Sequence, residues 1–274
     1  MRIMFLGTAA AEGWPAVFCQ CSNCKRARDA GGKNVRTRSS ILVNTDLKID
    51  FPPDTYHHVL KHGIELAAVE NLLITHTHQD HFYFEELYMR SKPFAKLLDG
   101  AVLHVYGTTA VYNKIEELNS STNGRLKNVV EARVVEPFRE FKVGGYLVTP
   151  LIADHSAAEQ CLIYIVSDGE KTFLHGHDSG WFPEETWRYL ENFKLDLAIL
   201  DCTNGALPEI RYHMGVDGVL RVKEEMVKRG IAGGETMFVA THFSHNGGLL
   251  YGELVDRFNP NNVEVAYDGL TVEL

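Results

Sequence analysis

The amino-acid sequence predicts an α/β fold. Short apolar runs typical of buried strands recur along the whole chain, and longer runs with helical character lie between many of them. Several of the strand-like runs also end directly in His or Asp residues. An apolar strand that ends in such residues would hold their side chains on a rigid edge, which favours a functional site there.

The individual elements follow from local patterns. Pro183 suits the first turn of a helix, and Gly230 after Lys228 and Arg229 suits a helix end. The segment 119–128 is rich in Ser, Thr, Asn and Gly and is predicted to be a loop. Strands are predicted at 3–6, 40–43, 72–75, 102–106, 129–135, 145–150, 162–166 and 197–200, and helices at 54–62, 84–98, 109–118, 183–192, 217–229 and 248–258. His58 and His62 of the first helix could bind metal, but an exposed polar face is the expectation.

Length and composition favour one large domain over residues 1–274. The chain has a mass of 30.8 kDa and is 45% hydrophobic, so it can bury a large core. The candidate ligands described below run from residue 76 to residue 242, so both halves must build one site. No apolar window approaches a membrane span and no signal pattern opens the chain, so we expect a cytoplasmic protein without membrane contact.

The net charge of −9 at pH 7 disfavours nucleic acid as a partner, because polyanions bind to basic patches. A small anionic substrate remains compatible with this charge, since bound dications would supply local positive charge.

The run His76-Thr77-His78-Gln79-Asp80-His81 holds three imidazoles and one carboxylate in six positions. Imidazole nitrogen and carboxylate oxygen are the ligands that zinc, manganese and iron accept in hydrolytic sites. With only 13 His in 274 residues, this clustering favours a metal site over a histidine-rich polar loop.

The spacing His-x-His-x-Asp-His resembles the signature of the metallo-β-lactamase superfamily. The resemblance implies a four-layer αββα sandwich, with two sheets face to face, helices on both outer faces, and the motif at one rim. It also implies two divalent metals, completed by a later His, a bridging Asp and a His near the C-terminus. Three apolar runs do lead into such residues, at His155, Asp178 and His242. The resemblance therefore assigns His76, His78 and His155 to one metal, Asp80, His81 and His242 to the other, and Asp178 to both.

Two such metals would share a bridging water, lower its pKa toward neutrality and supply hydroxide. The metals expected are Zn²⁺ or Mn²⁺, with Fe as a further option. Asp50 matches a residue that orients a ligand His through the second ring nitrogen. His213 is predicted to be a general acid or phosphate contact, against the alternative of a surface loop histidine, and it is the predicted catalytic residue together with Asp80.

The segment Cys19-Gln20-Cys21-Ser22-Asn23-Cys24 places three of the five cysteines within six residues. In a cytosolic chain such clustering favours thiolate ligation over disulfides, with a redox-active or buried thiol cluster as the alternative. A structural zinc site needs four ligands, and no fourth ligand follows locally.

The opening 6–15, followed by Cys-x-Cys-x-x-Cys, is similar to the PhnP-like branch of the superfamily, the phosphoribosyl cyclic phosphodiesterases. That branch completes a Cys₃His zinc site with a His three residues beyond the active-site His, which implies His245 here. Two departures from the branch leave the substrate open. The chain has His177-Asp178-Ser179 where Ser-Asp-Thr is common, and Thr203-Asn204 where Ser-His follows Asp-Cys.

The function predicted is a dinuclear metal-dependent phosphodiesterase that acts on a small cyclic phosphodiester. Hydrolysis of another ester, a lactone or RNA is an alternative. A non-catalytic binding protein similar to the pyrroloquinoline-quinone biosynthesis protein is another, although this chain keeps every ligand. The oligomeric state, a homodimer included, and the roles of segments 82–98 and 119–128 stay open.

Overall fold

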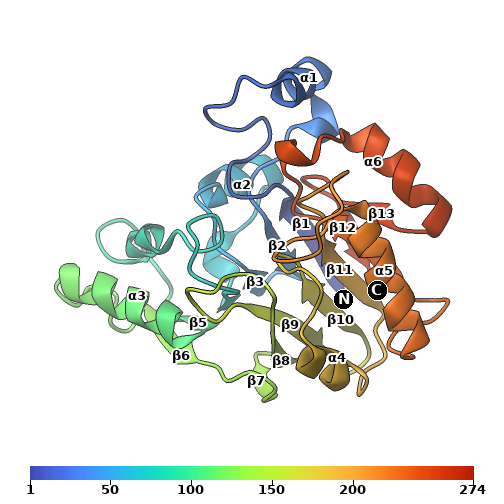
Figure 1. Ribbon diagram of the computed structural model, residues 1–274. Helices are drawn as coiled ribbons and strands as arrows, with labels where there is room; N and C mark the ends of the chain where they lie inside the picture. The colour runs from blue at the N-terminus through green and yellow to red at the C-terminus, as the bar shows by residue number, and fades with distance from the viewer.

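Two seven-stranded β-sheets pack face to face in the computed structural model, which describes residues 1–274 (Figure 1). The first sheet has the order β14 (Thr271–Glu273), β1 (Arg2–Gly7), β2 (Ser40–Val43), β3 (Leu47–Ile49), β4 (Asn71–Leu73), β5 (Leu103–Gly107) and β6 (Val130–Val134). The second has the order β13 (Glu264–Val265), β12 (Met237–Thr241), β11 (Leu197–Asp201), β10 (Thr172–Gly176), β9 (Leu162–Ser167), β8 (Tyr146–Ile152) and β7 (Phe141–Val143).

Helices cover the outer face of each sheet (Figure 1). Helices α2 (Thr55–His62) and α3 (Thr109–Ser121) and the 3-10 helix η3 (Phe84–Arg90) lie over the first sheet. Helices α4 (Glu184–Leu190), α5 (Val216–Lys228) and α6 (Tyr251–Phe258) lie over the second, and α1 (Ser22–Ala30) lies beside α6. The predicted four-layer αββα sandwich is confirmed. No helix has the length and apolar character that a membrane span requires.

Strand alternation builds three hydrophobic cores. In β10, Phe173 points into the core between the sheets, whereas Leu174 points outward into the core beneath α4 and α5. A third core fills the space between the first sheet and its helices, with Val111 and Ile115 of α3 among its members. The sheets are thus buried on both faces.

Parallel pairing brings the ends of distant strands to the same edge. Strands β10, β11 and β12 run parallel, with Asp201 opposite Thr241. Strands β3 and β4 are also parallel, with Ile49 opposite Leu73. The segments that follow these strands therefore emerge side by side at the carboxyl edge of the two sheets.

The structure corrects four local predictions. The predicted loop 119–128 begins later, because helix α3 continues to Ser121. The predicted helix 84–98 is only the 3-10 helix η3, and residues 91–98 are irregular. Pro93 explains this end, because proline lacks an N–H and restricts the residue before it. Helix α1 was not predicted, because its polar sequence carries no apolar stripe. His58, expected on an exposed helix face, is buried, and its Nε2 lies 2.8 Å from Thr37 Oγ1.

Candidate metal centre

The predicted ligands come together at this carboxyl edge. His76 to His81 follow β4, Asp178 follows β10, and His242 follows β12. Asp178 and His242 both have left-handed backbone, with φ of 54° and 61°. Non-glycine residues adopt this conformation rarely, and it clusters at functional sites. The left-handed backbone at these two positions therefore helps to direct the Asp178 and His242 side chains into the candidate site.

A first group is formed by His76, His78, His155 and Asp178. His78 Nδ1 lies 2.8 Å from His76 Nε2 and 3.1 Å from His155 Nε2. Asp178 Oδ2 lies 3.2 Å from His76 Nε2 and 3.4 Å from His155 Nε2. Three imidazole nitrogens and one carboxylate oxygen thus surround one point.

A second group is formed by Asp80, His81, His242 and again Asp178. His81 Nε2 lies 3.0 Å from Asp80 Oδ2 and 3.3 Å from His242 Nε2. The same nitrogen lies 3.0 Å from Asp178 Oδ2. Asp178 therefore lies between the two groups, as the resemblance implies for a bridging ligand.

The donor set fits a pair of divalent metals. The ring nitrogens and the carboxylate oxygen of each group converge on one small region, as ligands do around a cation, and Asp178 Oδ1 is buried without a hydrogen-bond partner. Burial by itself raises the pKa of Asp178, but His242 and His81 outweigh it and hold the pKa well below its usual range. An ionised carboxylate among imidazoles is the ligand chemistry of zinc, manganese and iron.

Asp50 supports the second group from behind. It is fully buried; its Oδ2 accepts from His81 Nδ1 at 2.7 Å and its Oδ1 accepts from the Thr75 N–H at 2.9 Å. Two histidines to which the sequence analysis gave no role continue inward, with His177 Nε2 3.1 Å from Asp50 Oδ2 and 3.1 Å from His175 Nε2. Their only signal in the sequence is their place directly before Asp178.

We expect Asp50→Asn to weaken metal binding about 10- to 100-fold, because the His81 ring loses the charged acceptor that orients it. Competition with a chromophoric chelator measures this affinity. Asp46→Asn is the matched control, since Asp46 accepts from the Tyr146 hydroxyl away from the ligands. Equal affinities of the two variants would contradict the orienting role.

His213 lies on the rim of the centre, in the loop before α5. Its Nδ1 is 3.1 Å from Asp201 Oδ2 and 3.2 Å from Asp178 Oδ1, and its side chain is 26% exposed. Burial lowers the pKa of His213, but the Asp201 carboxylate outweighs it and raises the pKa to about 9. The sequence analysis gave Asp201 no role, although its position at the end of a buried strand was a signal. Thr203 also contributes, with Oγ1 2.7 Å from His242 Nδ1.

The cysteine cluster and His245 form a separate site. The ligand atoms of Cys19, Cys21, Cys24 and His245 lie within 4.8 Å of one another, and all five cysteines of the chain are free. His245 Nδ1 is 3.4 Å from Cys21 Sγ and 3.7 Å from Cys19 Sγ. This Cys₃His set fits structural zinc.

Backbone N–H groups favour thiolates in this site. The Cys24 N–H donates to Cys21 Sγ at 3.4 Å and is the main reason that the pKa of Cys21 falls to about 6. Burial raises the pKa of Cys24 to about 11, although the Ala16 N–H donates to its sulfur at 3.3 Å. A cation would offset the cost of ionising that buried thiol.

The sandwich and the histidine-rich site at its edge define a protein of the metallo-β-lactamase fold. Residues 41–243 match the model of the beta-lactamase superfamily domain, and the chain belongs to this superfamily. Among solved structures it is similar to a diphosphatase from the PhnP family, at a TM-score of 0.76 and 22% identity over 100% of this chain and 97% of that one. It is also similar to Zn²⁺-bound PqqB from Methylobacterium extorquens, at a TM-score of 0.72 and 18% identity over 100% of both chains. These two likenesses establish the fold alone.

Curated relatives match parts of the chain. Ribonuclease Z of Listeria innocua is 27% identical over 158 residues, which are 57% of this chain and 46% of the relative. Coenzyme PQQ synthesis protein B of Xanthomonas campestris is 33% identical over 93 residues, which are 30% of this chain and 31% of the relative. The chain thus spans less than half the length of each of these relatives.

Proposed function

We propose that this protein is a dinuclear metal-dependent phosphodiesterase that hydrolyses a small cyclic phosphodiester. The observation that supports the proposal best is the convergence of two ligand groups on the shared carboxylate of Asp178, with His213 on the rim beside it. The similarity to a PhnP-family diphosphatase is consistent with phosphate chemistry.

Seven residues of the site would bind the metals, and His213 would act on the substrate. His76, His78 and His155 would hold one metal, and Asp80, His81 and His242 the other, with Asp178 between them. When bound, such metals supply positive charge for a phosphoryl oxygen and a nucleophile at neutral pH. His213, held by the buried Asp201, is positioned to contact the phosphate or to donate a proton to the leaving oxygen.

Turnover of bis(p-nitrophenyl) phosphate and of a five-membered ribose cyclic phosphate tests this proposal. We expect metal-loaded protein to hydrolyse both, chelation to abolish turnover, and added Zn²⁺ or Mn²⁺ to restore it. Failure of Zn²⁺-, Mn²⁺- and Fe-loaded protein to hydrolyse any phosphodiester would contradict the proposal. Hydrolysis of a diphosphate bond alone would move the assignment to phosphoanhydrides.

His213→Ala should lower kcat on the cyclic phosphate by about 10²- to 10⁴-fold, the usual contribution of general acid catalysis. Metal content, measured by elemental analysis, should not change, because His213 is not among the proposed ligands. The exposed His57 of α2 provides the control variant His57→Ala. A kcat within threefold of the wild type would remove His213 from the mechanism.

A further inference from the structure

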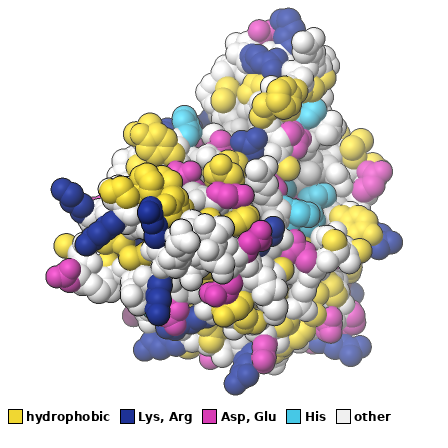
Figure 2. Space-filling view, turned by 90° about the vertical axis from the view of Figure 1, so that its left-hand side faces the viewer, with side chains coloured by type: hydrophobic (Ala, Val, Ile, Leu, Met, Phe, Trp, Pro, Cys, Tyr) yellow, Lys and Arg dark blue, Asp and Glu magenta, His cyan; other side chains and the backbone are white.

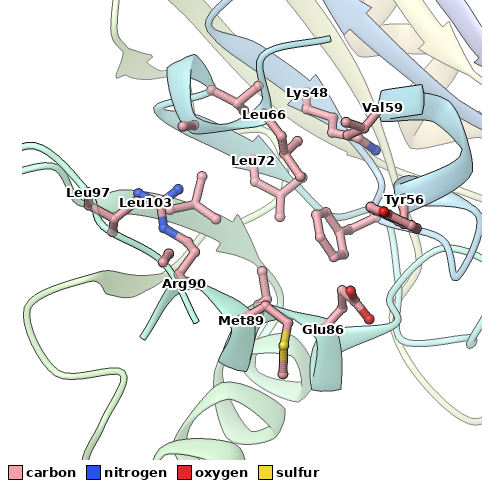
Figure 3. A pocket seen from close by; sticks show the side chains of 15 residues that line it. Lys48, Tyr56, Val59, Leu66, Leu72, Glu86, Met89, Arg90, Leu97 and Leu103 are labelled. Carbon is pink, nitrogen blue, oxygen red and sulfur yellow. The ribbon is translucent and has the colours of Figure 1, made fainter. Parts of the chain in front are cut away.

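A cavity lies away from the metal centre, beneath α2 and η3 on the outer face of the first sheet (Figure 3). Its volume is about 280 Å³, and none of the candidate metal ligands lines it. The lining is mainly hydrophobic and includes Phe51, Val59, Leu66, Leu72, Leu87 and Leu103. A concave apolar cavity with few polar groups is the usual form of a small-molecule site.

Exposed hydrophobic side chains continue outward from this cavity. Tyr56 and Met89 line it and are 66% and 41% exposed, and the nearby Leu60, Phe94 and Leu98 are also exposed. Figure 2, which looks onto this side of the molecule, shows hydrophobic side chains gathered in a patch with Lys and Arg beside it. Contiguous apolar surface of this kind marks interaction sites.

Arg90 gives the cavity a cation with free donors. Its Nε donates to the Val129 carbonyl at 3.1 Å, and no carboxylate lies within ion-pair distance of its guanidinium. Burial is the only influence on its pKa, which it lowers. The lining holds two other charged side chains. Lys48 is already engaged, because its ammonium donates to Ser40 Oγ and the Asp50 carbonyl. The Glu86 carboxylate lies across the cavity from Arg90 (Figure 3), so an anionic head group is favoured only at the Arg90 end.

We propose that this cavity binds a small amphiphile that joins an apolar chain or ring to an anionic head group such as a carboxylate. The apolar part fills the space between Val59, Leu72 and Leu103. The head group accepts from the terminal N–H groups of Arg90, which are planar donors suited to carboxylates. The apolar lining provides affinity, and the guanidinium selects for negative charge.

Calorimetric titration of the metal-loaded, full-length protein tests this site with three probes: octanoate, octan-1-ol and octyltrimethylammonium. Octanoate should bind at least tenfold more tightly than the cation of the same chain length. Arg90→Gln should weaken octanoate binding about tenfold and leave octan-1-ol binding unchanged. Val59→Phe should abolish binding of all three probes, because the larger ring occupies the cavity.

Matched variants control for surface effects. Lys92→Gln removes an exposed cation from the same segment, and Leu60→Phe enlarges an exposed neighbour on the same helix. Both should bind octanoate within twofold of the wild type. Equal affinity for the anion and the cation, or octanoate binding that survives Val59→Phe, would overturn the proposal. A dimer that Val59→Phe dissociates would also overturn it, because a second copy would then cover the cavity. If Val59→Phe does not fold, the affinities of Arg90→Gln for octanoate and octan-1-ol test the proposal. Unchanged octanoate affinity in that variant would overturn it.

Discussion

Asp178→Ala is expected to remove both active-site metals and to lower phosphodiesterase turnover at least about 10³-fold. Asp178 is the only carboxylate that approaches both ligand groups, with Oδ2 3.2 Å from His76 Nε2 and 3.0 Å from His81 Nε2. Its loss opens both coordination shells at once. Metal stabilisation of transition-state charge contributes several kcal/mol, and about 4 kcal/mol corresponds to this change in rate.

Elemental analysis and steady-state kinetics on one preparation measure both effects. Asp256→Asn, on the exposed face of α6, is the control and should keep metals and activity. The zinc of the cysteine site should remain in Asp178→Ala, which separates local metal loss from unfolding. Wild-type metal content in the active site of this variant would show that Asp178 does not bridge.

Cys24→Ser is expected to remove one zinc and to destabilise the whole protein. Cys24 is buried, and the proposed site joins the N-terminal loop to the segment after β12 through His245. Structural zinc contributes to folding directly, because the unfolded chain has no preformed site. A loss of about 5 kcal/mol would lower the melting temperature by about 10 °C or more in a chain of this size.

Thermal unfolding and zinc content, measured together, test this expectation. Cys161→Ser is the matched control, because Cys161 is also buried but lies outside the Cys₃His group. The Cys161→Ser variant should retain the zinc expected at the Cys₃His site, whether or not the substitution destabilises the protein. A Cys24→Ser variant with full zinc content would show that the cysteine cluster is a packed thiol group and not a metal site.

The sequence pattern predicted an α/β fold, and its resemblance to the metallo-β-lactamase superfamily implied the αββα architecture and the residues that meet at the metal centre. Four of these residues could be recognised because they lie within one six-residue segment: His76, His78, Asp80 and His81. The resemblance implied three later ligands, and the apolar, strand-like runs that precede His155, Asp178 and His242 located them in the sequence. Local patterns were less reliable where one proline or a polar helix decided the outcome, as in segment 84–98 and helix α1.

The resemblance had implied Asp50 as a supporting group, but only the tertiary structure showed that Asp201, Thr203 and His177 also support the ligands. The parallel pairing of β11 with β12 brings Asp201 beside His242, and the loop before α5 brings His213 to the same carboxylate. The packing of the two sheets brings His177 onto Asp50. Such contacts join residues between 12 and 127 positions apart, so no local period or spacing records them. Long-range packing also places Arg90 and Glu86 on different sides of one mainly apolar cavity (Figure 3). The metal-binding residues could be recognised from motifs in the sequence. The orientation of their side chains, the pKa values of the site and the shape of the apolar cavity depend on packing between distant segments.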